Sequence, residues 1–284
     1  MFSENIQEKL KEAMFHAGEL VLSARYDDSP VHATQQLGIE VKPGSVNFVT
    51  AYDKAVQALL EDEFSQILPE ARFLAEEDDD SGADNGIVNA RDSLSGFVFV
   101  IDPIDGTTNF IKDYRLSTIS AGLLKDGEPV WGAVLQPYSG EYFHAARGCG
   151  AFLGDKQIYA SNVPLARSLI VFGTSPYYRQ TLGRKSMAAA EELLMRATDL
   201  RRSGSAAYDL CTLAAGRADG FFELSLSPWD YAAGGLILKE AGGIVTNAFG
   251  EPLPFGRGIS SSVVAGNSKN YPDILEIVGN IMTK

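Results

Sequence analysis

The chain has 284 residues, of which 45% are hydrophobic and 21% charged, and this length accommodates one large domain or two modest ones. Its formal net charge of −13 argues against nucleic-acid binding, which needs a basic patch to meet the phosphates. The first residues lack a secretion signal and no apolar run could span a bilayer, so we expect a cytoplasmic protein without a membrane partner. Cys149 and Cys211 are then expected to be free thiols.

The first part of the chain is expected to hold two helices with a short strand between them. Apolar or small residues recur at helical spacing over residues 6–24, which indicates an amphipathic helix for the core or a dimer interface. Residues 39–42 alternate like a strand. Residues 48–53 lead into a second helix that ends near residue 68. Thr50 and Asp53 have the spacing of a capping box, so Asp53 has a structural interpretation as a helix cap.

An acidic run follows the second helix. Glu76 comes directly after the apolar residues 73–75 and can therefore end a strand. Asp78, Asp79 and Asp80 precede a segment rich in serine, glycine and asparagine, so we expect them in an exposed loop.

The next strand opens into a polar cluster. Residues 97–101 form an uninterrupted apolar run, typical of a strand that is buried on both faces, and Pro103 is expected to end it because proline has no N–H. Asp102 and Asp105 would then leave the sheet through a tight turn, and residues 106–108 offer N–H groups at a helix start. Carboxylates beside amides that face an anion predict a site for metal and phosphate. The alternative is an ordinary Asp-Gly turn.

The remaining elements divide into two patterns. Strand-like segments separated by turns predict an antiparallel meander over residues 116–124, 130–136 and 141–146. From about residue 165 strands and helices alternate, which is typical of a mixed or parallel α/β sheet. The strands are expected at 168–173, 199–202, 220–224 and 244–246, and the helices at 182–195, 206–215 and 230–241. A boundary between two halves is expected near residues 150–160.

Three separated motifs resemble those of the inositol monophosphatase family, which belongs to a superfamily of Mg²⁺-dependent, lithium-sensitive phosphatases. They are Leu74-Ala75-Glu76-Glu77, the run from Asp102 to Phe110, and the segment from Trp229-Asp230 to Gly242-Gly243. Ala75 stands where the family usually has glycine. The resemblance implies a layered αβαβα sandwich, the sugar-phosphatase fold. Its α+β metal-binding half would span residues 1–155, and its α/β substrate-binding half with a mixed sheet would span residues 156–284.

The resemblance also implies the ligands of two or three Mg²⁺ ions. Asp102 would bridge two ions, with Glu76 and the Ile104 carbonyl on one ion and Asp105 and Asp230 on the other. Hard oxygen ligands suit Mg²⁺, and so acidic a chain needs cations before it can hold a phosphate. Asp230 also has a structural alternative, because an acid at a helix start interacts favourably with the helix dipole.

The catalytic residues implied by the resemblance are Thr107, supported by Asp53, to orient and help deprotonate a water, together with Glu76. The implied substrate contacts are Gly106, Thr107, Gly204, Ser205, Ala206, Glu223 and Lys42. Helix capping or a charge at a strand end is the alternative for Ser205 and Glu223, and a solvated lysine is the alternative for Lys42.

The expected reaction is hydrolysis of inositol 1-phosphate or a similar small polyol or sugar phosphate by metal-activated water. Fructose-1,6-bisphosphatase and histidinol-phosphatase activities are alternatives on the same fold, and regulatory protein binding is the non-enzymatic alternative. We also expect a homodimer.

Overall fold

The computed structural model describes residues 4–24, 37–41, 48–79 and 94–283. Its largest sheet has seven strands in the order β3-β4-β5-β6-β7-β8-β9. They are β3 (Arg72–Ala75), β4 (Phe97–Asp105), β5 (Thr118–Lys125), β6 (Glu128–Gln136), β7 (Glu141–Ala146), β8 (Ala151–Leu153) and β9 (Lys156–Ile158). β3 is parallel to β4, and the later neighbours are antiparallel, so the predicted meander is confirmed. A small separate sheet pairs β1 (Glu40–Val41) with β2 (Phe48–Val49).

The prediction that Pro103 ends its strand is wrong. β4 continues to Asp105, because a bulge accommodates the proline without a ladder hydrogen bond from it. Asp102 pairs with Ser120 and Asp105 pairs with Thr118, so two residues of β4 lie opposite one residue of β5. The expectation that Asp102 and Asp105 leave the sheet through a tight turn is therefore also wrong, because both belong to β4, where they are buried.

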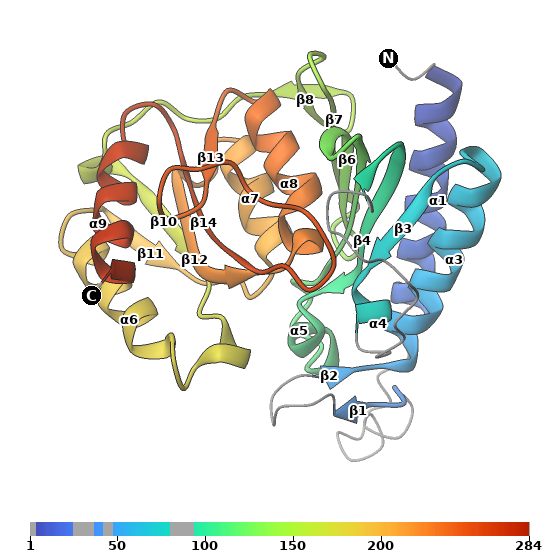
Figure 1. Cartoon of the computed structure of the whole chain (residues 1–284), viewed down its shortest axis with the longest axis horizontal. Helices are drawn as coiled ribbons and strands as arrows, with labels where there is room; N and C mark the ends of the chain where they lie inside the picture. Colours follow the sequence, from blue (N-terminus) through green and yellow to red (C-terminus); the bar gives the residue numbers. More distant parts are fainter. Residues whose placement is uncertain (1–3, 25–36, 42–47, 80–93, 284) are drawn as a thin grey trace.

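Helices α1 (Glu4–Leu22) and α3 (Ala51–Ile67) cover one face of this sheet (Figure 1). The buried residues of α1 recur at helical spacing, as predicted: Leu10, Ala13, Met14, Ala17 and Val21. Phe64 of α3 stacks on Phe99 of β4 with their ring centroids 4.5 Å apart. The predicted capping box of Thr50 and Asp53 is present at the start of α3.

The acidic run after β3 does not begin an exposed loop, because residues 76–79 form the short helix α4 (Glu76–Asp79). Gln57 of α3 holds this turn. Its Oε1 accepts the N–H of Glu77 at 3.0 Å, and its Nε2 donates to Asp78 at 3.1 Å. The expectation of a loop was wrong for Asp78 and Asp79, because both belong to α4, and composition does not reveal that Asp78 has a partner on another helix. Asp80 lies outside the described residues.

The second sheet has five strands in the order β11-β10-β12-β14-β13. They are β10 (Leu169–Phe172), β11 (Asp199–Arg201), β12 (Gly220–Leu226), β13 (Ile244–Thr246) and β14 (Ser261–Gly266). β10 is parallel to β11 and β12, whereas β14 is antiparallel to β12 and β13. The sheet is therefore mixed, as the alternation of strands and helices indicated, although β14 was not among the predicted strands.

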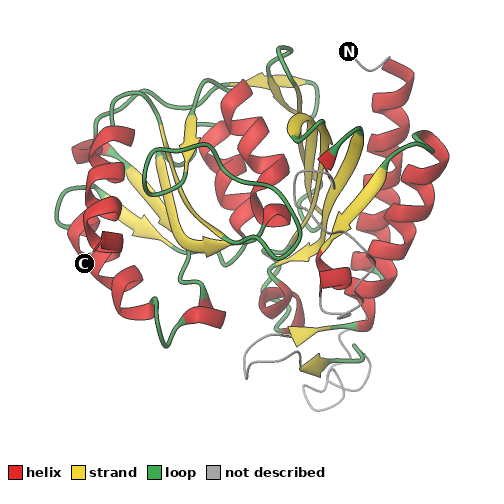
Figure 2. Ribbon diagram, in the orientation of Figure 1, coloured by secondary structure: helices red, strands yellow, loops and turns green. Residues whose placement is uncertain are grey.

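Helices α7 (Ala206–Ala214) and α8 (Pro228–Glu240) lie between the two sheets (Figure 1). Helices α6 (Gly183–Leu194) and α9 (Tyr271–Thr283) cover the outer face of the second sheet (Figure 2). This order of layers confirms the αβαβα sandwich. α8 packs closely on the first sheet, because a Cβ at Gly122 would lie 2.9 Å from Cβ of Ala232, and one at Gly132 would lie 2.9 Å from Cα of Ala233.

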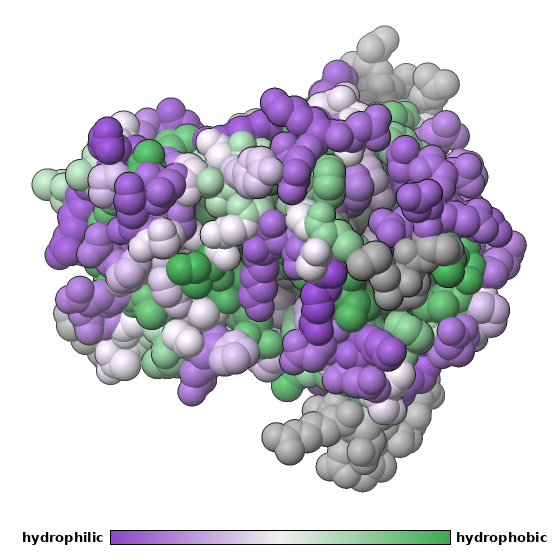
Figure 3. All heavy atoms as spheres, turned by 90° about the horizontal axis from the view of Figure 1, so that it is seen from above, coloured by the Kyte–Doolittle hydropathy of each residue, from purple (hydrophilic) through white to green (hydrophobic). Residues whose placement is uncertain are grey.

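The predicted division of the chain after residue 155 stays a prediction. In the structure it falls in the turn between β8 and β9, which both belong to the first sheet. Cys149 and Cys211 are free thiols, as expected. None of the described helices is both long and apolar enough to cross a bilayer. The face in Figure 3 is mostly hydrophilic, with hydrophobic residues in small groups. The cytoplasmic location and the homodimer stay predictions.

Candidate metal centre and active-site cavity

A cavity of about 590 Å³ lies where the end of β4 meets the beginnings of α7, α8 and the short helix α5 (Thr107–Ile111). The predicted site residues that line it are Glu76, Asp102, Ile104, Asp105, Gly106, Thr107, Gly204, Ser205, Ala206, Glu223 and Asp230. Asp53 lies behind this wall and is fully buried. Lys42 lies outside the described residues. The structure thus brings together residues from both halves of the sequence.

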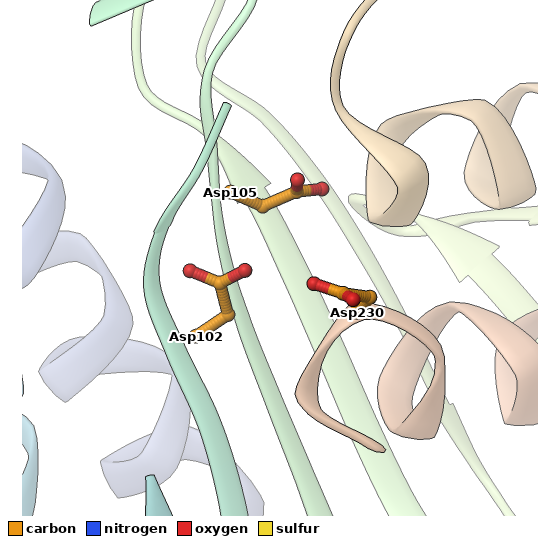
Figure 4. A group of neighbouring side chains, drawn as sticks. All are labelled: Asp102, Asp105 and Asp230. Carbon is orange, nitrogen blue, oxygen red and sulfur yellow. The ribbon is translucent and has the colours of Figure 1, made fainter. Parts of the chain in front are cut away.

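Three aspartates converge in the cavity wall (Figure 4). Asp102, Asp105 and Asp230 each offer a carboxylate oxygen, and these oxygens lie within 4.8 Å of one another. The first two come from the end of β4, and Asp230 comes from the first turn of α8. There Asp230 Oδ2 accepts the N–H of Ser227 at 2.7 Å, so Asp230 also serves as part of a capping box.

Burial and mutual repulsion disfavour the charged forms of these acids. Burial raises the pKa of Asp102 well above its usual range, and the charges of Glu76, Asp105 and Asp230 raise it further. Burial, then Asp105 and Glu76, also raise the pKa of Asp230. Burial raises the pKa of Asp105 to about 6 against opposing hydrogen bonds from Ser205 and the start of α7. A divalent cation would remove the repulsion, and hard oxygen donors of this kind fit Mg²⁺.

The two other predicted metal ligands lie beside this cluster. Glu76 is the first residue of α4. Its charge is the largest cause, after burial, of the raised pKa of Asp102. The carbonyl oxygen of Ile104 lies 3.3 Å from Thr107 Oγ1 and is one of two acceptors within reach of that hydroxyl's single proton, the other being Asp53; the carbonyl also has a lone pair for another partner. Their roles as ligands stay predictions.

The second half of the chain holds Asp105 in place. Asp105 Oδ2 accepts hydrogen bonds from Ser205 Oγ and from the N–H of Ala207, both at 2.7 Å. Thr118 Oγ1 lies 3.0 Å from the same Ser205 Oγ. Ser205 is the N-cap of α7, so its hydroxyl is engaged within the protein, and its contact with substrate stays a prediction. Sequence reasoning did not reveal the bond to Asp105, although a serine before a helix is typical of an N-cap.

Two glycines allow the halves to approach at the cavity wall. Gly106 and Gly204 have positive φ angles of 93° and 89°. A Cβ at Gly106 would lie 3.0 Å from the carbonyl oxygen of Gly204. Close by, Asn109 Nδ2 donates to the carbonyl of Ser203 at 3.0 Å. Glycine is therefore needed at 106 both for its backbone conformation and for this close approach.

The expected contact between Thr107 and Asp53 is present across 54 positions of sequence. Thr107 Oγ1 lies 3.3 Å from Asp53 Oδ1. The other carboxylate oxygen of Asp53 accepts the N–H and the hydroxyl of Thr50 at 2.8 and 2.5 Å. Asp53 therefore caps α3 and contacts Thr107 at the same time. The catalytic role of the pair stays a prediction.

Two buried acids on the second half complete the cavity. Glu223 of β12 accepts the N–H of Ser175 at 2.7 Å, and burial raises its pKa to about 7. Asp209 of α7 is 2% exposed, and burial raises its pKa well above the usual range. Sequence reasoning missed Asp209 and Ser175. Asp209 could have been found, because it is an acidic residue within an otherwise apolar predicted helix. The sequence around Ser175 does not indicate that Glu223 is its partner.

Comparison with known proteins places this geometry in a family. Residues 3–283 match the model of the inositol monophosphatase family. Nus factor SuhB of Escherichia coli K12 is 34% identical over 254 residues, which cover 89% of this chain and 88% of that protein. Inositol-1-monophosphatase of Bacillus subtilis is 34% identical over 245 residues, which cover 85% and 87%. The structure of extragenic suppressor protein SuhB from Bartonella henselae matches with a TM-score of 0.82 at 29% identity, over 97% of this chain and 98% of that one. The chain belongs to the inositol monophosphatase family.

Proposed function

We propose that the chain is a Mg²⁺-dependent phosphomonoesterase that hydrolyses inositol 1-phosphate or a similar small polyol or sugar phosphate. The observation that carries this proposal is the convergence of Asp102, Asp105 and Asp230 to within 4.8 Å in a cavity that Thr107 also lines. Carboxylates this close repel a phosphate dianion unless cations lie between them. Membership of the family and the name of the Bacillus subtilis relative support the same reaction.

Two or three Mg²⁺ ions would be held by the three aspartates together with Glu76 and the Ile104 carbonyl. When bound, Mg²⁺ neutralises phosphate charge and lowers the pKa of water. Binding of Mg²⁺ to these residues can be measured without turnover, because an ion that binds only the folded chain raises the melting temperature of the chain. Asp230→Asn should weaken that rise, whereas a variant affected only in capping would change the melting temperature equally with and without Mg²⁺.

Thr107 and Asp53 would position and deprotonate the attacking water. When the Thr107 hydroxyl donates to Asp53 Oδ1, its oxygen lone pairs can accept a hydrogen bond from a water in the cavity. As the water oxygen attacks phosphorus, its proton would pass to Thr107 Oγ1 and the hydroxyl proton to Asp53. The backbone N–H groups of Gly106 and Thr107 would hold the phosphate oxygens, and Glu223 would accept hydrogen bonds from substrate hydroxyls.

The direct test is phosphate release from inositol 1-phosphate by the purified chain. We expect release with Mg²⁺, none in excess chelator, and inhibition by millimolar lithium, the last from family resemblance alone. Undiminished hydrolysis in chelator would contradict the metal mechanism. A panel that includes fructose 1,6-bisphosphate and histidinol phosphate decides between the inositol phosphatase and its two enzymatic alternatives.

A regulatory function is the second candidate, because the relative from Escherichia coli is named a Nus factor. For this reason the absence of a nucleic-acid partner, expected from the net charge of −13, stays a prediction. Complementation of a deletion strain separates the two functions. Asp102→Asn should behave like the deletion if hydrolysis is the biological role, and like the wild type if macromolecular contacts suffice.

A further inference from the structure

Tyr177 lines the same cavity as the proposed metal ligands. It lies in the short 3₁₀ helix η3 (Pro176–Tyr178), which belongs to the connection between β10 and α6. The residue is 52% exposed, so its ring contributes little to the core. The side chain is therefore accessible to a molecule bound in the cavity.

The backbone that presents Tyr177 has an unusual conformation. Ser175 precedes η3 and has a φ angle of 42°, although it is not a glycine, and it is buried. A residue with a side chain persists in this left-handed region only when its surroundings hold it there, and such residues concentrate at functional sites. The turn that carries Tyr177 is therefore a candidate for a functional role.

Strand β12 holds Ser175 in this conformation. The N–H of Ser175 donates to Glu223 Oε1 at 2.7 Å, and the N–H of Ser225 donates to Ser175 Oγ at 3.0 Å. The single proton of that hydroxyl can reach the Ser225 carbonyl at 3.1 Å or Glu223 Oε1 at 3.3 Å. The N–H of Tyr178 donates to the carbonyl of Ser175 at 2.8 Å, so the bonded turn encloses Tyr177. The backbone of Tyr177 is thus fixed relative to β12 without any ligand.

The hydroxyl of Tyr177 responds to the charges of the proposed metal site. Burial beside the cavity raises the pKa of Tyr177 above its usual range, even though half of the residue is exposed. Four charges raise this pKa further, and they belong to Glu76, Asp230, Asp102 and Asp105. The hydroxyl therefore keeps its proton at neutral pH. Within the described part of the chain it has no hydrogen-bond partner, so the proton is available to a ligand.

A free O–H donor beside these four acids suits the phosphate of the substrate. In the proposed reaction this phosphate lies next to the metal site, and its anionic oxygens accept hydrogen bonds strongly. The N–H groups proposed to hold it, those of Gly106 and Thr107, come from the first half of the chain, whereas Tyr177 comes from the second half. We propose, resting on the proposed phosphatase function, that the Tyr177 hydroxyl donates a hydrogen bond to an oxygen of the reacting phosphate, so that both halves of the chain hold this group.

The test uses two phosphate monoesters that the wild type hydrolyses and that differ in the leaving group, such as inositol 1-phosphate and glycerol 2-phosphate. Tyr177→Phe keeps the ring and should lower kcat/KM about tenfold, by the same factor for both substrates. Tenfold is the low end of the range for hydrogen bonds to charged groups, because Tyr177 is half-exposed. The loss should appear mainly in KM, since the bond is made to the bound substrate and to the transition state alike.

Binding of inorganic phosphate gives a readout without turnover. With Mg²⁺ present, Tyr177→Phe should need about tenfold more phosphate than the wild type for the same rise in melting temperature. The rise caused by Mg²⁺ alone should be unchanged, because the hydroxyl is not proposed as a metal ligand. Tyr159→Phe is the matched control, because Tyr159 is 64% exposed, directly follows β9 and does not line the cavity. It should change neither measurement.

The outcomes distinguish this inference from the proposed function. Wild-type kinetics or wild-type phosphate affinity in Tyr177→Phe would overturn the role of the hydroxyl and leave the phosphatase intact. A loss for only one of the two substrates would do the same, because it would place the hydroxyl on the leaving group, and so would a lost response to Mg²⁺. No phosphate release from any substrate by the wild type would overturn the proposed function, and with it this inference.

Discussion

Replacement of Asp102 by asparagine should stabilise the metal-free chain while it removes the response to Mg²⁺ and abolishes hydrolysis. The amide keeps the size of the carboxyl group, and its Oδ1 can still accept the N–H of Ile104, as Asp102 does at 3.0 Å. Its NH₂ can donate to Glu76, which is hydrogen-bonded to Asp102. The fold loses no contact, and the cluster loses one buried negative charge.

The size of the gain follows from the spacing of the aspartates. Two unit charges separated by 4.8 Å, the limit within the cluster, repel by about 3 kcal/mol at an effective dielectric constant of about 20. Proton uptake already relieves part of this repulsion, because the pKa of Asp102 and that of Asp230 are raised. We therefore expect a gain of about 1–3 kcal/mol in the free energy of unfolding at neutral pH, or roughly 2–4 °C in melting temperature per kcal/mol.

Thermal unfolding in chelator and in excess Mg²⁺ measures both effects. The wild type should gain stability from Mg²⁺, whereas Asp102→Asn should start higher and gain little. Asp209→Asn is the matched control, because Asp209 is a buried acid of the same cavity outside the aspartate cluster. It should raise the metal-free melting temperature and keep the response to Mg²⁺. An Asp102→Asn chain that is less stable without metal, or that responds to Mg²⁺ like the wild type, would refute the reasoning.

Three other predictions test the remaining parts of the site. Alanine at Thr107, at Asp53 or at both should lower kcat by nearly the same factor, because the two residues act as a unit. Additive losses of rate in this double-mutant cycle would leave Asp53 as a helix cap alone. The same conclusion would follow if Asp53→Ala kept a normal rate and lost only about 0.5–2 kcal/mol of stability. Burial raises the pKa of Glu223 from 4.5 to about 7 and that of Asp105 from 3.8 to about 6, so the folded chain binds these protons more tightly than the unfolded chain does. Metal-free stability should therefore fall as the pH rises from about 4 to 7, and melting curves of Glu223→Gln should show a smaller fall. Gly132→Ala should cost about 1–3 kcal/mol, measured by denaturant unfolding, because the new Cβ would lie 2.9 Å from the α8 backbone; an unchanged midpoint would contradict this packing.

Elements with a strong local pattern could be predicted from the sequence. β13 was expected over the residues that form it, and α7 was expected within one residue of its observed end. α9 could also have been predicted, because Ile274, Ile277 and Val278 recur at helical spacing. The path of β4 past Pro103 could not, because the bulge depends on the register with β5. The position of β14 between β12 and β13 likewise depends on its partners rather than on its own residues.

The site could be predicted only as far as its residues belong to short motifs. The aspartates and Thr107 occur in local segments, and the structure brings them together as the resemblance implied. The groups that hold them come from distant segments, as the bond from Ser205 to Asp105 across 100 positions shows. Arg202 also lines the cavity, but an arginine just after a strand is ordinary until the cavity beside it is known.

The position of α8 explains why neither half of the chain can form the aspartate cluster alone. Trp229 and Ala232 pack against residues of β3, β4 and β5, while Ile237 and Leu238 belong to the core around α7 and the second sheet. A helix that is apolar on all sides is stable only when it is buried on all sides. Asp230, in the first turn of α8, therefore reaches Asp102 and Asp105 only when both sheets have packed against this helix. A cation bound among the three carboxylates would then join β4 to α8, so its binding energy would stabilise the packing of the two halves as well as the cavity.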